Sequence, residues 1–263
     1  MIIDFHTHCF PDRLAPRAME TLQHASGGIS IYTDGTAAGL LRRRDEDGVD
    51  RAVVLNIATN AHQQTSVNDF AASFHSDRLI SFGSVHPDAP NALEELDRIV
   101  SLGLRGIKFH PEYQNFRVDD EKMRPIYQKI SRLGLPVVFH AGYDLGFAGP
   151  ANCSPARLSH ALQWLDTTVV AAHWGALADW ESVASTLCGL PLFFDTSFGK
   201  GTIPLPAAKK IVERHGADKI LFGSDCPWHA PKMDLDFLDL LELSESEKEA
   251  ILHKNAEKIL KLS

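Results

Sequence analysis

Short runs of apolar residues, mostly β-branched or aromatic, recur along the whole chain, and a helical pattern of apolar positions follows most of them. Most runs are continuous rather than alternating, which is typical of parallel strands covered on both faces. We predict eight strands, at Ile2–His8, Arg51–Ile57, Leu79–Val85, Gly106–His110, Pro136–Ala141, Thr168–His173, Leu192–Thr196 and Ile220–Ser224. The spacing between them predicts helices at Asn91–Leu102, Asp120–Leu133, Pro155–Leu165, Ala176–Leu187 and Pro206–His215.

Eight strand–helix units in 263 residues have about 33 residues each, the size of a βα repeat. A last helix is predicted at Ser244–Leu262, with a capping box between Ser244 and Glu247. The fold prediction is therefore α/β: a single (β/α)8 barrel domain over residues 1–263. A doubly wound open sheet is the rival, but no glycine-rich phosphate motif follows any predicted strand. The long connection at residues 9–50 is expected to hold one or two helices and a loop over the barrel mouth.

Composition narrows the class of protein further. A hydrophobic content of 44% with 23% charged residues is typical of a globular chain. The formal net charge of −8 opposes nucleic-acid binding, which depends on neutralising phosphates. No apolar run approaches the ~18 residues of a membrane span, and the first residues show no targeting segment. We therefore expect a cytoplasmic protein that acts on a small molecule, binds neither nucleic acid nor membrane, and is compatible with a homo-oligomer.

Histidine is the unusual feature of the composition, because the chain has 13 of them. Barrel enzymes carry their reacting groups at the carboxyl ends of the strands. His6 and His8 are two positions apart on the first predicted strand, so both imidazoles face the same side. Alone, such a pair more often indicates two hydrogen-bonded core histidines. Other predicted strands, however, are also followed by ionisable residues: His86, His110, His140, His173 and Asp225.

Taken together, these strand ends indicate that His6 and His8 are more than hydrogen-bonded core histidines. Apolar runs end in His140 and in His173 just before glycine-containing turns, and the last predicted strand is followed by Asp225. Burying so many ionisable groups without a shared partner would be strongly unfavourable. A bound metal ion removes that penalty, so the sequence predicts a metal site at this rim.

At this point the chain resembles a known group, the amidohydrolase superfamily, in its His-x-His, the two later histidines and the final aspartate. Four segments are similar to the amidohydrolase-related branch, which contains aminocarboxymuconate-semialdehyde decarboxylase and related lyases. They are DFHTHCFP at 4–11, GIKFHP at 106–111, FGSD at 222–225 and NAEKIL at 255–260. The resemblance extends from residue 4 to residue 260 and indicates a superfamily, not a substrate.

The resemblance implies that one divalent ion is bound by four residues: His6, His8, His140 and Asp225. Three imidazoles and a carboxylate suit zinc, with manganese, iron and cobalt as alternatives. Such an ion can lower the pKa of water to about 7. Asp225 is then the expected catalytic base. His173 is expected either to orient the water or the developing oxyanion, or to be a fifth ligand.

Lys108 leaves the number of metal ions open. If its amine is carboxylated, the resemblance implies a second ion, which Lys108, His140 and His173 would bind. The alternative is an unmodified ammonium paired with a buried carboxylate such as Asp4 or Asp195. His110, and less strongly His86, are expected to contact the substrate or a metal ligand, or else to hydrogen-bond loop carbonyls.

We expect a metal-dependent hydrolase that activates water to cleave an amide, lactone or ester-like bond. The runner-up is a non-oxidative decarboxylase of the same fold, which would need a cation for the substrate carboxylate; Lys108, Arg105, Arg117 and Arg157 are the candidates. Some aromatic-acid decarboxylases of the branch carry Glu where this chain has His6, which favours hydrolysis. A TatD-like nuclease is less favoured, given the negative charge and the absence of Glu on the fourth strand. A non-catalytic metal-binding protein is the remaining alternative.

Overall fold

Eight short parallel strands lie at the middle of the fold, and each falls within a run that the sequence predicts as a strand. The structure is a computed structural model that describes residues 1–262. The strands are β1 (Ile3–Thr7), β2 (Arg51–Leu55), β3 (Leu79–Phe82), β4 (Ile107–Phe109), β5 (Val137–Phe139), β6 (Val169–Ala171), β7 (Phe193–Asp195) and β8 (Ile220–Leu221).

The strands pair in chain order, as β1-β2-β3 and as β4-β5-β6-β7-β8. Parallel bridges join the edges of the two groups, one between Gly83 and Ile107 and one between Thr7 and Cys226. The Lys108 amide also donates to the Gly83 carbonyl at 2.8 Å. These contacts connect β3 to β4 and β8 to β1, so the strands follow one another around a ring. The predicted barrel architecture is confirmed.

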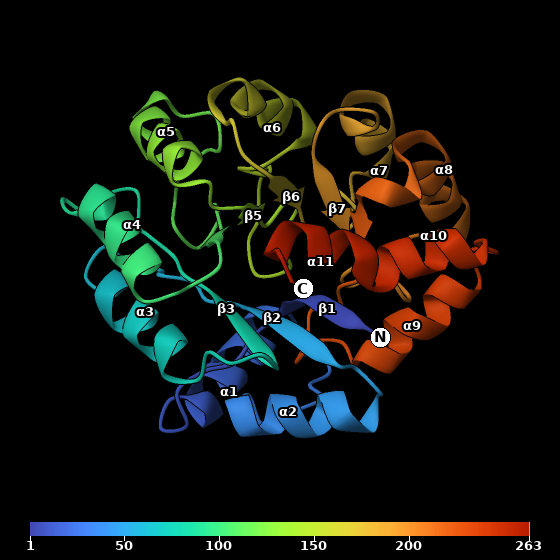
Figure 1. The fold of residues 1–263 in the computed structure, drawn as a ribbon, viewed down its shortest axis with the longest axis horizontal. Helices are drawn as coiled ribbons and strands as arrows, with labels where there is room; N and C mark the ends of the chain where they lie inside the picture. Colours follow the sequence, from blue (N-terminus) through green and yellow to red (C-terminus); the bar gives the residue numbers. More distant parts are fainter. Residues whose placement is uncertain (263) are drawn as a thin grey trace.

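Helices surround the strands on the outside (Figure 1). The long first connection holds two of them, as predicted, and the capping box between Ser244 and Glu247 is present. The helix predicted from Ala176 begins only at Trp180, after a turn in which Ala178 has a positive φ. The helices and helical turns are α1 (Ala15–Ala25), α2 (Ala37–Glu46), α3 (Gln64–Ser73), α4 (Ala92–Ser101), η1 (Glu121–Met123), α5 (Arg124–Leu133), α6 (Pro155–Ala161), η2 (Leu162–Trp164), α7 (Trp180–Ser182), η3 (Val183–Leu187), α8 (Leu205–His215), η4 (Ala217–Lys219), α9 (Pro231–Asp239), α10 (Glu245–Glu249), η5 (Ala250–Lys254) and α11 (Asn255–Leu260).

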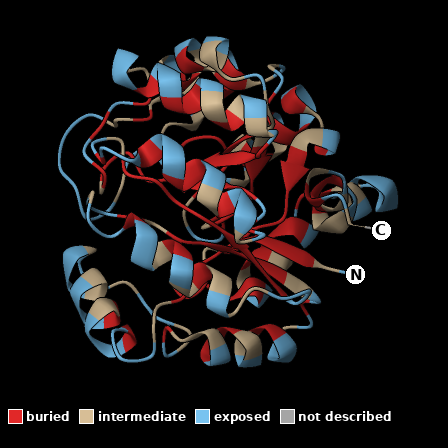
Figure 2. Ribbon diagram, turned by 60° about the vertical axis from the view of Figure 1, so that its left-hand side comes forward, coloured by how far each residue is buried: buried red, intermediate tan, exposed pale blue. Residues whose placement is uncertain are grey.

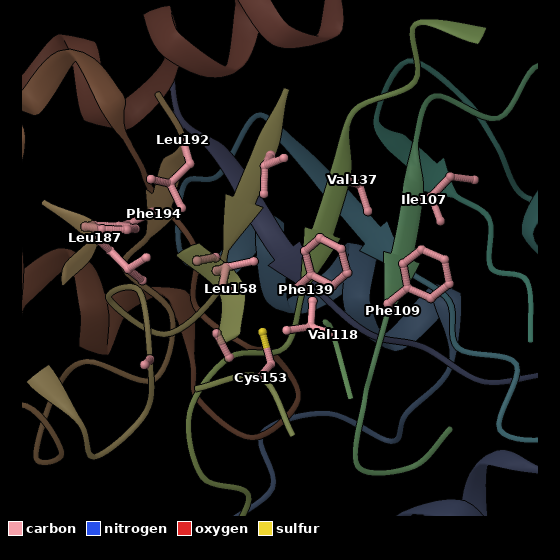
Figure 3. Packing of buried hydrophobic residues seen from close by; sticks show 14 of the residues in the cluster. Ile107, Phe109, Val118, Val137, Phe139, Cys153, Leu158, Leu187, Leu192 and Phe194 are labelled. Atoms are coloured by element: carbon pink, nitrogen blue, oxygen red, sulfur yellow. The ribbon is translucent and has the colours of Figure 1, made fainter. Parts of the chain in front are cut away.

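Burial follows this layout, because the strands are buried and the outer helix surfaces are exposed (Figure 2). On β4, Ile107 and Phe109 belong to the apolar layer beneath the helices, where Phe109 stacks on Phe139 at a ring distance of 5.6 Å (Figure 3). Lys108, between them, faces the other side of the strand, into the barrel. No helix within residues 1–262 is both long and apolar enough to cross a membrane.

Candidate metal centre and its cavity

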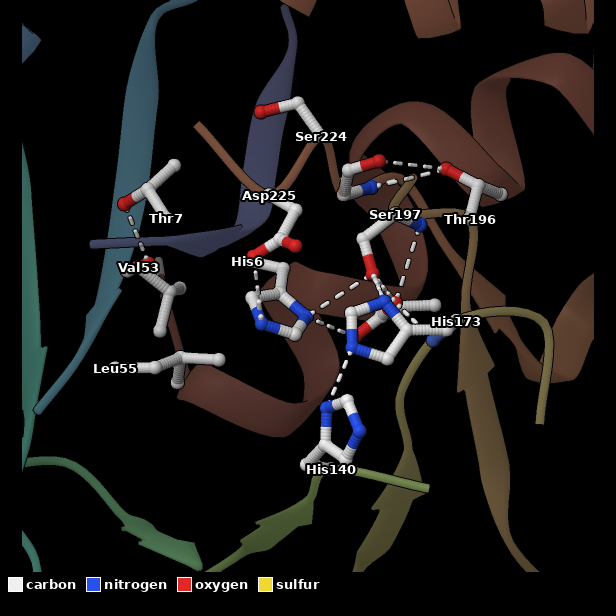
Figure 4. A network of polar contacts seen from close by, with 12 residues as sticks. His6, Thr7, Val53, Leu55, His140, His173, Thr196, Ser197, Ser224 and Asp225 are labelled. Carbon is white, nitrogen blue, oxygen red and sulfur yellow. Dashed lines mark hydrogen bonds and ion pairs between the residues drawn. The ribbon is translucent and has the colours of Figure 1, made fainter. Parts of the chain in front are cut away.

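His6 and His8 bring their Nε2 atoms to within 3.2 Å of each other at the carboxyl end of β1. The spacing of two along the strand places both rings on one side, as the sequence predicts. Asp225, after β8, completes the group, since its Oδ1 lies 3.1 Å from His8 Nε2 and 3.4 Å from His6 Nε2. Three candidate ligand atoms from the two ends of the chain therefore meet at one point. Figure 4 shows two of these residues, His6 and Asp225, side by side.

The other ring nitrogens fix which atoms carry protons. His8 Nδ1 lies 2.9 Å from the Leu55 carbonyl oxygen, which can only accept, so Nδ1 is the donor. His6 Nδ1 lies 2.9 Å from Asp195 Oδ2, a carboxylate oxygen, so this nitrogen is also the donor. In the neutral rings both Nε2 atoms are then unprotonated, and their lone pairs face each other beside the Asp225 oxygen. Three acceptors repel one another unless a cation lies among them. The Lys108 amine approaches His6 Nε2, at 3.4 Å, but makes no ion pair with Asp225 in the described residues, so these residues fit a bound metal ion.

Burial lowers the pKa values of both His6 and Lys108. Burial, reinforced by the nearby Lys108, lowers the pKa of His6 well below its usual value, which keeps the imidazole in the neutral form that metals require. Lys108 is fully buried and its Nζ lies 3.4 Å from His6 Nε2. Burial lowers the pKa of Lys108 to about 8.

The alternative in which the Lys108 ammonium pairs with Asp4 or Asp195 is not seen in the structure. No ion pair within 4.0 Å involves Lys108 in the described part of the chain. Asp4 accepts instead from the Ser224 hydroxyl and amide, and Asp195 from His6, so both carboxylates already have partners. The Lys108 amine thus lies at the metal centre itself.

His173 and His140 form a second layer next to this group rather than part of it. His173 Nε2 lies 3.0 Å from His140 Nδ1, and His173 Nδ1 lies 2.9 Å from the Ser197 hydroxyl. The other nitrogen of His140, Nε2, lies 3.2 Å from the Tyr143 carbonyl oxygen. The structure does not bring His140 together with His6, His8 and Asp225, so its role as a metal ligand stays a prediction.

His110 and His86 differ in their access to the cavity. His110 stacks on His140 at a ring distance of 4.1 Å, and its Nε2 lies 3.3 Å from Asp144 Oδ2. His110, His140 and Asp144 therefore form a further group of possible ligands that opens into the cavity. His86 is not among the residues that line the cavity; its Nδ1 accepts from the Asp88 amide at 3.2 Å and holds a loop.

Two of the strand-end residues have strained backbones. His173 has φ of 60° and Asp225 has φ of 70°, in the left-handed region that L-residues rarely adopt. Such conformations cost about 1–3 kcal/mol each and persist where surrounding contacts impose them. Their occurrence at two predicted catalytic residues is consistent with a functional site.

The metal centre opens into a cavity of about 650 Å³ that is lined mostly by apolar side chains. Lys108 lies in this lining and Arg13, after β1, is at its exposed edge. Two of the arginines considered from the sequence are engaged elsewhere: Arg105 reaches the Leu260 carbonyl and Arg157 pairs with Asp119. The fourth candidate, Arg117, does not line the cavity either.

Sequence reasoning missed two residues that shape this site, Arg13 and Ser197, and gave Asp195 only as a possible partner of Lys108. Asp195 and Ser197 stand at the carboxyl end of β7, for which the sequence gave no candidate ligand. The same strand-end rule, applied to the segment FFDTS at 193–197, would have found them. Arg13 has no comparable signal, because it lies in an irregular segment before α1.

Comparisons with known proteins agree with the barrel fold. An uncharacterized TIM-barrel protein, Bb4693 from Bordetella bronchiseptica, has a TM-score of 0.76 at 20% identity, covering 99% of this chain and 98% of that one. The 5-carboxyvanillate decarboxylase LigW from Sphingomonas paucimobilis has a TM-score of 0.74 at 16% identity, covering 100% and 99%. A manganese-bound mutant of the related LigW2 from Novosphingobium aromaticivorans has a TM-score of 0.75 at 15% identity, covering 100% and 97%.

These likenesses support the assignment of the fold as a TIM barrel. Residues 3–262 match the family described as amidohydrolase, so the chain belongs to that family. The resemblance seen in the sequence is thereby confirmed. The comparison with curated proteins gave no match.

Proposed function

We propose that the protein is a metal-dependent hydrolase that cleaves an amide, lactone or ester-like bond of a small molecule. The observation that carries the proposal is the meeting of Asp225 Oδ1 with the two Nε2 atoms of His6 and His8, at 3.1–3.4 Å. This places a carboxylate base at the point where a divalent ion fits, at the inner end of an open cavity. A divalent ion bound there would lower the pKa of water to about 7.

Three residues of the chain have roles in the proposed reaction. Asp225 accepts the proton of the attacking water and returns it to the leaving group, as a general base and then a general acid. His173, kept neutral because burial lowers its pKa well below the usual value, is held by Ser197 and orients the water or the developing oxyanion. Lys108 lies close enough to stabilise negative charge that develops at the centre.

The donor set of imidazole nitrogen and carboxylate oxygen suits several divalent metals. Zinc is the first candidate for nitrogen-rich sites, and manganese, iron and cobalt accept the same ligands. The manganese in the LigW2 structure supports manganese as the alternative. His140 is proposed as a further ligand, with a second ion if Lys108 is carboxylated.

Decarboxylation is the second candidate, and the cations of the cavity favour it. A substrate carboxylate at the metal centre would meet the Lys108 amine, and a second acidic group would meet Arg13 at the cavity edge. The fold neighbours include enzymes described as decarboxylases, such as LigW. In this reaction Asp225 or His173 would protonate the carbon that loses CO2.

One experiment separates the two reactions. Metal-loaded protein is incubated with a panel of amides, lactones and carboxylated aromatics, and CO2 release is scored separately from hydrolysis. Product that forms without CO2, and incorporates oxygen from labelled water, supports hydrolysis. Stoichiometric CO2 supports the second candidate and overturns the first. Protein that stays metal-free after loading, with normal folding, overturns both.

A further inference from the structure

Helix α1 has an apolar stripe that the core does not use. Only Ala15 and Met19 of this helix are buried against the rest of the protein. Leu14, at the N-cap, and Ala18 and Leu22 within the helix recur every four residues on a neighbouring face, and all three line the cavity instead. Leu14 remains 48% exposed, although core-facing leucines of a barrel helix are normally covered.

Helix α3 contributes a second apolar wall to the same cavity. Its Gln64, Asn68 and Ala71 are buried toward the barrel. Val67 and Phe70, on the adjacent face, line the cavity and are only half-buried. Both helices thus present partly exposed apolar side chains to one space, although Phe70 also packs on Phe74 at a ring distance of 4.8 Å.

This apolar space is continuous with the metal centre. One cavity of about 650 Å³ includes the cluster of His6, His8 and Asp225 at its inner end and the stripes of α1 and α3 farther out. Leu145, in the loop after β5, also lines it and is 57% exposed. Pockets of about 300–1,000 Å³ hold drug-sized ligands. The cavity is therefore much larger than a ligand with a single aromatic ring requires.

We propose that the cleft between α1 and α3, defined by Leu14, Ala18, Leu22, Val67 and Phe70, binds an extended hydrocarbon body of the substrate. The inference rests on the proposed function only in placing the reacting group of that substrate at the metal centre. The substrate class is then an acyl or carboxyl compound with an apolar tail, longer than a one-ring acid. Hydrocarbon is the chemistry that matches walls made of apolar, partly exposed side chains.

The size of the effect follows from the burial of methylene groups. Each buried methylene contributes about 0.8 kcal/mol, which is about fourfold in affinity. Six added methylene groups that are fully buried would give about 4,000-fold, so with partial burial affinity is expected to rise about 100-fold or more from a two-carbon to an eight-carbon ligand. A ligand that projects its tail into water shows no such rise.

Straight-chain hydroxamates from acetohydroxamate to octanohydroxamate test this on the metal-loaded protein, by calorimetry. The hydroxamate group binds metal ions, so acetohydroxamate reports on the metal centre alone. Benzohydroxamate and naphthohydroxamate distinguish rings from chains as the hydrocarbon. Fatty acids of the same lengths form an arm that needs no metal, so it reports on the cleft even if the centre binds no hydroxamate.

Variants locate the effect on α1. Leu22→Asp places a carboxylate in the cleft and should lower the ratio of octanohydroxamate to acetohydroxamate affinity about tenfold or more. Ala18→Trp fills the cleft and should lower the same ratio. Thr21→Asp adds the same charge to the exposed side of the helix and should leave the ratio unchanged. Circular dichroism of each variant confirms folding.

The outcomes separate this inference from the proposed function. Affinity that rises with chain length, and depends on Leu22 but not on Thr21, supports the cleft. Affinity independent of length in both the hydroxamate and the fatty-acid arms, with acetohydroxamate bound, overturns the cleft and leaves the metal centre standing. Fatty acids that bind with the expected length dependence, while acetohydroxamate does not bind, support the cleft and overturn the proposed function.

Discussion

The Asp195 carboxylate accepts a hydrogen bond from His6 Nδ1 at 2.9 Å, across 189 residues of sequence. Its other oxygen accepts from the backbone amides of His173 at 3.0 Å and Ser197 at 3.1 Å. One fully buried carboxylate therefore fixes both the tautomer of His6 and the position of the strand end that carries His173. Such partners orient metal-binding imidazoles and raise their basicity.

Asp195→Asn is expected to weaken metal binding about 10-fold to 100-fold. The amide can donate to His6 Nδ1, which moves the ring proton to Nε2 and removes the lone pair that faces the centre. Metal affinity is measured by competition with a chelating dye. Asp97→Asn, which removes an exposed carboxylate paired with Lys129, is the control and should not change it. Equal affinities in the two variants would show that Asp195 does not position His6.

Purified protein is expected to hold one equivalent of divalent metal, and a His6→Ala/His8→Ala double variant to lose it. The reason is that the two Nε2 atoms supply two of the three converging ligand atoms. Elemental analysis by mass spectrometry gives the stoichiometry. A His24→Ala/His62→Ala variant removes two exposed histidines and should keep the metal. A second equivalent in the wild type would contradict a single-ion centre and would indicate a carboxylated Lys108 or an ion at His110.

Asp225→Asn is expected to lower turnover of any substrate found in the panel about 100-fold to 10,000-fold, the usual contribution of a general base. The amide oxygen remains able to face the metal, so much of the ion should stay bound. Turnover and metal content are measured on the same preparation. Asp12→Asn, at an exposed carboxylate outside the cavity, should retain activity. Undiminished turnover in Asp225→Asn would exclude it as the base.

The barrel was predictable because its strands are continuous apolar runs, and such runs fit a sheet that is covered on both faces. The pairing of His6 with His8 was predictable for a similar reason, since strand geometry alone places residues two apart on one side. Asp225 could be added because all strand ends of a barrel meet at one rim. In each case the relevant information lies within a few residues of sequence.

The partners of Lys108 and His6 could not be derived in the same way. Asp4 and Asp195 are both buried carboxylates on strands, and local spacing does not show which groups they face. In the structure Asp4 accepts from Ser224, 220 residues away, whereas Asp195 accepts from His6. These choices depend on the register and tilt of strands that are distant in the chain. For this reason the sequence offered Asp4 and Asp195 as alternative partners of Lys108, although neither pairs with it.

A buried histidine far from the metal centre, His215, gives the last prediction. Its Nε2 lies 3.0 Å from the Leu192 carbonyl oxygen, its Nδ1 accepts from the Gly189 amide at 3.2 Å, and its ring stacks on Phe194. The neutral ring satisfies both contacts, whereas a protonated ring would put a proton between Nδ1 and the Gly189 amide. Burial lowers the pKa of His215 from 6.5 to about 4.

Stability should therefore fall with acid in a way that depends on His215. The unfolded chain binds a proton at this residue below pH 6.5, while the folded protein does so only below about pH 4. The contribution is complete above pH 6.5 and is lost as the pH falls toward 4, by up to about 2–3 kcal/mol. Urea unfolding between pH 6.5 and 4 gives the free energy of unfolding. This free energy should fall less steeply with acid for His215→Gln than for the wild type. The exposed control His24→Gln should follow the wild type, and parallel curves for all three proteins would show that His215 titrates alike in both states.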